Sequence, residues 1–327
     1  MKDVVRNAGR ARACLVLAAV LWSLGSVFMR LLREPLGLGL NEPGLSPLQI
    51  AFYRGLFGGL VVLATVRRAD VTFRAPMVGM VVAFTVMSGM YLSALDGPAA
   101  NAIFLQNTAP VWVYVFAVLA LGERGDRRGW TAVLLAAAGA AVIVSGNWPR
   151  NVAPDEHNKQ TLQLLLGLGS GVVYAVVVLF LRVLRNYSAA WLVALNLLGT
   201  AATLGLFVLL NDGWAAFAAW VTAPSGKQAA VLVVFGAFQM AFPYWLFARG
   251  LRTVSAHEAA LITLIEPLLN PVWAYLITPE KDTPNVWMFC GGALILFALV
   301  WKYVPARRRE FTAETAENAE KAGDKKR

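Results

Sequence analysis

The sequence predicts an all-α integral membrane protein with ten transmembrane helices, arranged as an inverted 5+5 structural repeat. Of its 327 residues, 58% are hydrophobic and 15% are charged, whereas about 25% of the residues of a soluble domain are charged. The apolar residues come in runs of about twenty, the helix length that crosses roughly 30 Å of hydrocarbon. The two halves of the chain also match each other at constant offsets. Together these observations exclude a soluble protein.

Ten apolar runs, separated by short connections, give the predicted spans. The first begins near Ala11 and is followed by no small-residue cleavage site, so it is a helix rather than a signal peptide. The longest connections are rich in Gly, Pro or Asn and cover residues 33–46, 147–160 and 211–227. The spans are residues 12–32, 47–66, 76–95, 98–121, 128–146, 161–183, 189–210, 228–248, 256–278 and 285–303.

The distribution of charge predicts which side of the membrane each connection occupies, because cytoplasmic loops carry an excess of Lys and Arg. With the N-terminus inside, 22 of the 29 basic residues fall on the inner side and six on the outer side. We therefore expect a multi-pass protein of the cell (inner) membrane with both termini in the cytoplasm. Residues 1–11 form the N-terminus, 147–160 an external linker and 304–327 a disordered basic tail. The net charge of +10 indicates contact with the lipid bilayer and not with nucleic acid.

Residues 12–146 and 161–303 are predicted to be repeats of five spans each. Chance similarity between apolar helices is the alternative, but Arg, Pro, Glu and Trp match by chance less readily than Leu or Ala. Because five is odd, two such halves in series have opposite orientations, an architecture of secondary transporters that bind substrate near the midplane. The matches are Arg30/Arg182 and Arg33/Arg185 at an offset of 152, and Pro110/Pro267, Glu123/Glu280 and Trp130/Trp287 at an offset of 157.

Several short motifs occur in order along the chain. They are Leu21-Trp22-Ser23, Ser46-Pro47 with Arg54, Ala109-Pro110, Leu121-Gly122-Glu123-Arg124 and Ile265-Glu266-Pro267. With these motifs the chain resembles the drug/metabolite transporter superfamily, and within it the EamA-type ten-helix proteins, over about residues 12–303. It departs from the family after span 9, where Pro279-Glu280-Lys281 replaces the usual Gly-Glu-Arg, and its loop 33–46 is longer than usual.

The resemblance implies transport and says less about the substrate. Proteins similar in fold carry amino acids, other metabolites, drugs and, among relatives, nucleotide sugars and phosphorylated sugars. Prokaryotic members of this type resemble amino acid exporters. We therefore expect a secondary transporter that exports small polar metabolites, above all amino acids, by alternating access around a midplane cavity. The alternatives are a facilitative transporter of another solute class (drug, nucleoside or sugar derivative) and a membrane-embedded enzyme.

Catalysis, metal binding and cofactors are not expected. A membrane-embedded enzyme would need His, Asp, Ser or Lys gathered at one membrane face, and Glu123 and Glu280 fall on opposite sides of the predicted topology. Two cysteines and two histidines are too few for a Cys/His metal centre. No nucleotide-binding motif is present. The expected partners are a small-molecule substrate and the bilayer, and the expected state is a monomer.

Arg54 and Glu266 are the charged residues predicted at membrane depth. Arg54 lies about eight residues into span 2 and Glu266 near the middle of span 9. Such charges need a partner or a water-filled cavity. In a functional role, Arg54 would bind a substrate carboxylate and Glu266 an amino group or a proton. In a structural role, the two would form an ion pair that locks their helices, and the sequence leaves both roles open.

The predicted hinges are three prolines inside spans 4, 8 and 9, namely Pro110, Pro243 and Pro267. A proline removes a backbone donor and frees the carbonyl four residues earlier. The freed carbonyls belong to the polar residues Gln106, Gln239 and Thr263. This pattern favours polar backbone that lines a cavity, and an ordinary packing kink is the alternative.

The predicted substrate-binding set adds polar and aromatic side chains at depth to the two charges. Asn270 follows Glu266 by one turn, so both share a helix face. Tyrosine and tryptophan offer amphipathic walls for a small solute. The full set is Trp22, Ser23, Arg54, Tyr91, Gln106, Asn107, Tyr174, Tyr244, Glu266 and Asn270.

Overall fold

The computed structural model describes residues 2–150 and 152–304, and its regular elements are all helical. In this part of the chain, nine helical segments are long and apolar enough to cross a membrane, and the shorter apolar helix α3 (Pro47–Leu63) makes a tenth. The predicted fold class, an all-helical membrane protein with ten spans, is confirmed. Of the predicted tail, residues 305–327 lie outside the described residues.

The helices follow the predicted order along the chain. The first half contains α1 (Lys2–Ser23), α2 (Gly25–Arg33), α3, η1 (Arg68–Asp70), α4 (Ala75–Ala94), α5 (Ala99–Gln106), α6 (Ala109–Leu119) and α7 (Arg127–Gly146). The second half contains α8 (Pro154–Val183), α9 (Ala189–Thr222), α10 (Gly226–Val234), η2 (Phe235–Ala241), α11 (Phe242–Gly250), α12 (Ala256–Thr263), α13 (Ile265–Ile277), α14 (Pro279–Asp282) and α15 (Val286–Tyr303). Spans 1, 4, 8 and 9 are thus each divided into shorter segments, and η2 is a π-helix.

Two helices begin earlier than predicted. α1 begins at Lys2 rather than near residue 12, and α8 begins at Pro154, inside the predicted linker 147–160. Pro154 suits a first helical position, and the acidic residues that follow it interact favourably with the helix dipole. Hydropathy marks only the apolar part of a helix, whereas backbone hydrogen bonding continues beyond the hydrocarbon.

α9 also continues through much of the predicted connection 211–227. Its backbone leaves the helical conformation at Gly213, where φ is 82°, a value that glycine adopts readily. The chain then turns helical again and runs to Thr222. Tyr53 of α3 donates a hydrogen bond to the carbonyl of Val221, so a tertiary contact holds a segment that the sequence analysis assigned to a loop.

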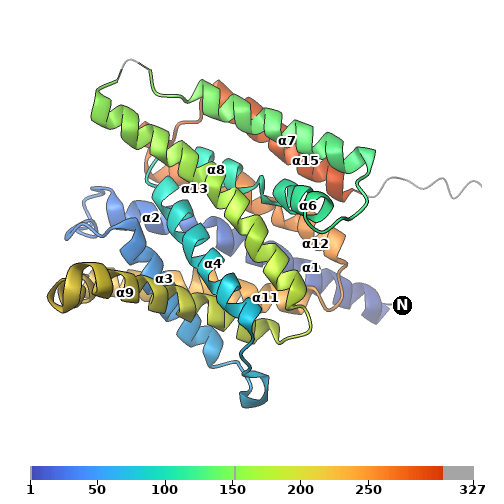
Figure 1. Cartoon of the computed structure of the whole chain (residues 1–327), viewed down its shortest axis with the longest axis horizontal. Coiled ribbons are helices and arrows are strands. Elements are labelled where there is room, and N and C mark those ends of the chain that lie inside the picture. Colours follow the sequence, from blue (N-terminus) through green and yellow to red (C-terminus); the bar gives the residue numbers. More distant parts are fainter. Residues whose placement is uncertain (1, 151, 305–327) are drawn as a thin grey trace, which may run out of the picture.

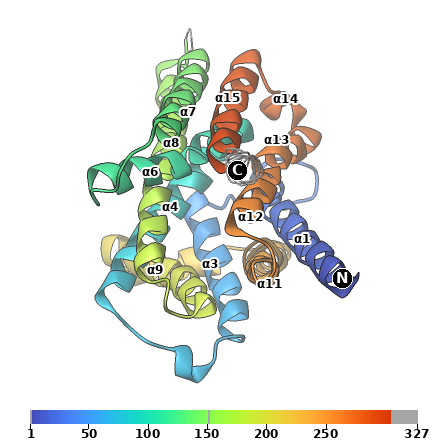
Figure 2. The same cartoon turned by 90° about the vertical axis from the view of Figure 1, so that its right-hand side faces the viewer.

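Helices of the two halves pack against each other in a regular pattern (Figure 1). α7 lies against α15, α3 against α9, α4 against α8 and α1 against α11. In terms of spans, these pairs are 5 with 10, 2 with 7, 3 with 6 and 1 with 8. When each span is replaced by its equivalent in the other half, the pair of spans 3 and 6 becomes the pair of spans 8 and 1. The pairs 5 with 10 and 2 with 7 are unchanged. Figure 2 shows α7 and α15 side by side, and α1 near α12 and α13.

Glycines allow the closest of these contacts. A Cβ atom on Gly139 of α7 would lie 2.6 Å from the carbonyl oxygen of Gly291 on α15, and a Cβ on Gly291 would lie 2.5 Å from that of Gly139. A Cβ on Gly55 of α3 would lie 2.7 Å from the carbonyl oxygen of Leu197 on α9. Small residues at helix interfaces let backbones approach in this way.

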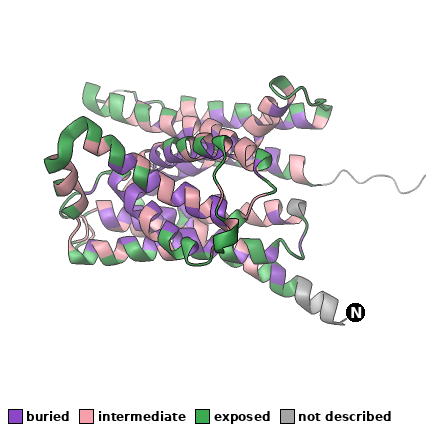
Figure 3. Ribbon diagram, turned by 60° about the horizontal axis from the view of Figure 1, so that its bottom comes forward, coloured by how far each residue is buried: buried purple, intermediate pink, exposed green. Residues whose placement is uncertain are grey.

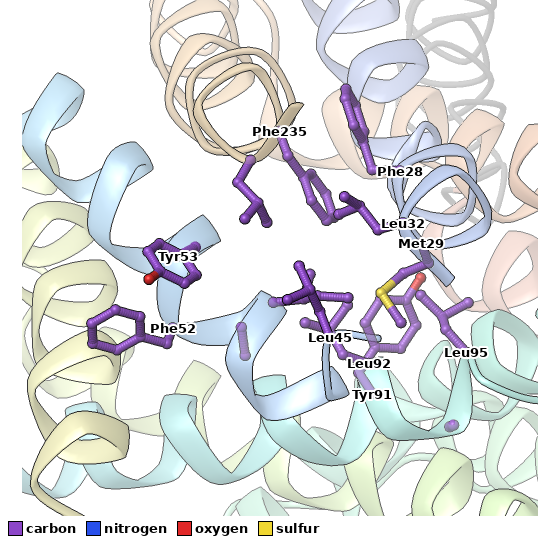
Figure 4. Close-up of a cluster of buried hydrophobic side chains, with 14 of the residues drawn as sticks. Phe28, Met29, Leu32, Leu45, Phe52, Tyr53, Tyr91, Leu92, Leu95 and Phe235 are labelled. Carbon is purple, nitrogen blue, oxygen red and sulfur yellow. The ribbon is translucent and has the colours of Figure 1, made fainter. Parts of the chain in front are cut away.

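The buried residues lie between the helices, and the exposed ones cover the outside (Figure 3). The largest apolar cluster joins α2, α3, α4 and η2 with the loop that follows α2 (Figure 4). In it, Phe28 stacks on Phe235 with ring centroids 4.5 Å apart. Leu45 of the loop is buried against this group. The cluster therefore closes the end of the bundle that carries residues 34–46.

Candidate functional site

Span 1 and two spans that it contacts, 8 and 9, are interrupted near their middle. Span 1 breaks at Leu24 between α1 and α2, span 8 contains the π-helix η2, and span 9 breaks at Leu264 between α12 and α13. α1 contacts η2, α11, α12 and α13. In membrane transporters, interrupted helices of this kind form substrate and ion sites, because their backbone groups are left without helical partners. The candidate site lies at these breaks.

Span 4 breaks at the equivalent place in the other half. α5 ends at Gln106 and α6 begins at Ala109, with Asn107 and Thr108 between them. At the offset of 157 that relates the two halves, Asn107 is equivalent to Leu264, where span 9 is interrupted. Each predicted hinge proline follows a break: Pro110 and Pro267 lie just after those of spans 4 and 9, and Pro243 follows η2. Hinge motion itself remains a prediction.

Trp22 and Ser23 connect the break in span 1 to spans 8 and 9. The amide nitrogen of Gln239 in η2 donates to the carbonyl of Trp22 at 3.0 Å. The Trp22 ring meets the ring of Tyr244 edge-on, with centroids 5.3 Å apart. The indole nitrogen of Trp273 donates to the buried Ser23 hydroxyl at 2.9 Å.

Two buried amides at this junction have unused hydrogen-bonding capacity. The side chain of Asn270 is fully buried, and neither its oxygen nor its nitrogen has a partner among the described residues. The side-chain oxygen of Gln239 also has no described partner. A Cβ atom on Gly25 would lie 3.4 Å from the Gln239 amide nitrogen and 3.9 Å from that of Asn270. Buried polar groups are nearly always paired, so these amides indicate a place for a ligand or water.

Arg54 is buried and has no carboxylate partner among the described residues. Its guanidinium donates to the hydroxyl of Ser88 on α4 at 2.7 Å and stands 5.5 Å from the centre of the Phe235 ring. The alternative of an ion pair between Arg54 and Glu266 is therefore absent from the described structure.

Glu266 lies on the inward face of α13. Asn270, one turn later, is fully buried, whereas Leu268, Val272 and Leu276 on the opposite face are exposed, as expected of a lipid-facing surface. Glu266 itself is only partly buried. It makes no hydrogen bond or ion pair with a described residue.

Three tyrosines from different spans surround Glu266. Tyr91, Tyr174 and Tyr244 all lie within electrostatic range of its carboxylate. Tyr91 and Tyr244 also lie within range of Arg54. Tyr174 is 38% exposed, although its neighbours Gly171 and Ala175 on α8 are buried. Arg54 and Glu266, which form no ion pair with a described residue, thus lie near the same two tyrosines, Tyr91 and Tyr244.

Gln106 and Asn107 take part in the break of span 4 instead. The amide of Gln106 contacts the sulfur of Met87 at 3.4 Å, and that of Asn107 donates to the carbonyl of Ile103 at 2.8 Å in its own helix. A Cβ on Gly171 of α8 would lie 3.0 Å from the Gln106 carbonyl oxygen. One groove lies at the end of α8 and another between α3 and α9. None of the predicted substrate-binding residues lines either groove. The predicted midplane cavity stays a prediction.

The sequence analysis missed an ion network around Arg30 and counted this residue only as an outer cation. Arg30 binds Asp282 through its Nε and Nη2 atoms at 2.7 and 2.8 Å, and both side chains are 1% exposed. Arg30 also donates to the carbonyls of Leu95 and Gly97 at 2.8 and 2.7 Å. Asp282 accepts from the backbone nitrogen of Ala99 at 2.8 Å. The sequence does contain a signal for this network, because Arg30 lies within an apolar run and a charge there needs a partner.

A second ion pair extends this network toward water. Arg33 donates to Asp96 at 2.7 Å. Burial alone would raise the pKa of Asp96, but the hydrogen bond and the charge of Arg33 outweigh it, so the pKa lies below its ordinary value. The network joins span 1 to the connections between spans 3 and 4 and between spans 9 and 10.

Comparison with known proteins gives matches along almost the whole chain. The EamA-like transporter family matches twice, at residues 11–145 and 161–303. A protein of Archaeoglobus fulgidus described as an uncharacterized transporter is 28% identical over 291 residues, which cover 87% of this chain and 93% of that protein. The pseudopaline exporter CntI of Pseudomonas aeruginosa is 25% identical over 291 residues, covering 87% of this chain and 94% of CntI.

One solved crystal structure is similar over the whole bundle. It has a TM-score of 0.57 and 19% sequence identity, and the match covers 91% of this chain and 98% of that one. At this identity the similarity supports the fold alone.

Proposed function

Because the chain belongs to the EamA-like transporter family, which matches both of its halves, we propose that it is a secondary transporter that exports small polar metabolites, with amino acids as the favoured class. It is a multi-pass membrane protein of a family of transporters rather than enzymes. In this proposal the N-terminus lies in the cytoplasm, the protein acts in the inner membrane as a monomer, and substrate binds near the midplane. The similarity to an exporter, CntI, supports the direction.

The proposed substrate class rests on two charged residues, Arg54 and Glu266, neither of which forms an ion pair with a described residue. A charge without a partner is costly at membrane depth, and a zwitterion would give each charge its counterpart. The substrate carboxylate would bind Arg54 and the ammonium group would bind Glu266. The unpaired side-chain oxygen of Gln239 and the side-chain amide of Asn270 would supply further hydrogen bonds.

The packing of the halves supports alternating access. The four helix pairs described above map onto one another when the halves are exchanged, and five spans per half give the halves opposite orientations, so we propose an inverted repeat. Arg30 and Arg182 are equivalent positions in the two halves. Arg30 is buried in the ion network, whereas Arg182 binds Glu123 at 2.6 Å with side chains 50% and 43% exposed. Transport would alternate which of these two ends is closed.

The test is uptake of labelled amino acids into liposomes that contain the purified protein. Glu266→Gln and Arg54→Gln are expected to lose uptake while keeping the melting temperature of the wild type. Leu268→Ala, on the lipid-facing side of the same helix, is the matched control and should transport normally. If the wild type is folded and moves no amino acid, the proposed substrate class is wrong. If the two charge variants transport normally, the assigned site is wrong.

A second solute class is favoured by the aromatic wall. The Trp22 ring packs against Tyr244 and Phe247, with centroids 5.3 Å away in each case. Such a wall would suit a planar solute, such as a nucleoside or an aromatic drug, carried by facilitated diffusion. Competition by nucleosides, sugar derivatives and cationic drugs in the same liposomes separates this alternative from amino acid export.

A further inference from the structure

A groove of about 560 Å³ opens between the loop after α6 and the end of α8, away from the candidate transport site. Leu121 and Glu123 line it from the loop. Val176, Leu179 and Val183 line it from α8. Its walls are therefore apolar, with charged side chains confined to one end.

The apolar wall faces the bilayer rather than the interior of the protein. Val176, Leu179 and Val183 follow one another at helical spacing and form one stripe on α8. Val183 is 66% exposed. Ser170 and Val177, on the other side of α8, are buried. A lipid chain can reach this stripe from the membrane without crossing the protein.

The charged end of the groove carries two arginines at the end of span 6. Arg182 and Arg185 both line the groove and are exposed. Arg182 is engaged by Glu123 at 2.6 Å, whereas Arg185 forms no ion pair with a described residue. They lie on the side of the membrane that carries most of the chain's basic residues, where anionic lipids attract Lys and Arg.

We propose that this groove binds one phospholipid with an anionic headgroup. Its acyl chain lies along Val176, Leu179 and Val183, and its phosphate is held by Arg185 and, in competition with Glu123, by Arg182. A soluble anion would leave the apolar wall empty, and a neutral headgroup would leave the net positive charge of the rim unbalanced. The apolar wall and the basic rim together therefore select a lipid over either alternative.

The test uses the purified full chain, stripped of lipid in detergent, and native mass spectrometry with phosphatidylglycerol or phosphatidylcholine. The wild type should retain one phosphatidylglycerol in preference to phosphatidylcholine. Arg185→Ala should weaken this binding about fivefold, the effect of one basic residue at an anionic surface. Arg68→Ala removes an exposed arginine outside the groove on the same predicted side and should change nothing.

Two more variants separate the groove from general charge. Val183→Trp fills the apolar wall and should abolish the retention of phosphatidylglycerol without removing a charge. Glu123→Gln frees Arg182 and should tighten binding, which a merely structural glutamate would not do. All variants are compared at equal melting temperature, and Arg185→Lys, which keeps the charge, should restore binding if Arg185→Ala proves unstable.

Three outcomes would overturn the proposal. Equal retention of the two lipids by the wild type would show that the headgroup charge does not contribute to binding. An equal loss in Arg68→Ala and Arg185→Ala would assign the effect to diffuse charge. Displacement of the lipid by inorganic phosphate at the same concentration would identify a free anion as the occupant.

Discussion

Arg30 and Asp282 form an ion pair through two hydrogen bonds of 2.7 and 2.8 Å, although 252 residues separate them in the sequence. Both side chains are 1% exposed, so neither charge can turn to water if its partner is lost. The pair joins the end of span 1 to the connection between spans 9 and 10. It thereby ties the two halves together at the end of the bundle that also carries the apolar cluster.

Removal of one charge from this pair should destabilise the protein strongly. Asp282→Asn is expected to lower the free energy of unfolding by about 3–5 kcal/mol, because buried Arg30 would lose the carboxylate that it binds through two hydrogen bonds and keep only Glu34, 3.7 Å away. Thermal melts in detergent measure the change. Glu258→Gln breaks the exposed pair between Arg12 and Glu258 and serves as the control, with a shift close to zero. Equal shifts in the two variants would refute the structural role assigned to Asp282.

Gly25 provides a test of the two free amides. Gly25→Ala places a methyl group 3.4 Å from the amide nitrogen of Gln239 and 3.9 Å from that of Asn270. Transport is expected to fall at least tenfold, with little change in melting temperature. Gly226→Ala, at the start of α10 with nothing within 4 Å, should transport like the wild type. Normal transport by Gly25→Ala would remove these amides from the proposed site.

The contact between α7 and α15 should not tolerate a side chain. In Gly291→Ala, the new Cβ atom would lie 2.5 Å from the carbonyl oxygen of Gly139, and backbone cannot move aside as a flexible side chain can. We expect a loss of about 1–3 kcal/mol of stability, measured by thermal melt. Gly9→Ala, with open space around the new methyl group, is the control. An unchanged melting temperature in Gly291→Ala would show that the two helices are farther apart than described.

The stability of the protein should depend on pH through the ionisation of Asp96. Its pKa in the folded protein lies below the ordinary value of 3.8, so its ionised form stabilises the fold above that value. This contribution is lost as the pH falls through the folded pKa. The wild type should therefore have a higher melting temperature than Asp96→Asn at pH 7. The difference should begin to shrink at about pH 4 and disappear only below the folded pKa of Asp96. A difference that persists at pH 2 would mean that the charge of Asp96 is not its cause.

The sequence by itself determined the class of the protein and supplied the candidate residues of its proposed site. Runs of about twenty apolar residues predict spans because membrane thickness acts on each helix separately, and ten were found. Arg54 and Glu266 were recognised because a charge at depth is conspicuous in any apolar run. Pro110, Pro243 and Pro267 were chosen for the local effect of the proline ring, and each lies just after an interruption in its span.

Only the tertiary structure decided which of these groups meet. Arg54 was considered as a partner for Glu266, but it bonds to Ser88, whereas Arg30, counted as an outer cation, forms the buried pair. The helix after Gly213 and the approach of Gln239 and Asn270 to Gly25 were equally absent from the local pattern. The physical reason is that hydropathy and proline effects act within a few residues of the chain. Ion pairs and orphaned amides depend on neighbours that the packing of the two halves brings together from hundreds of residues away.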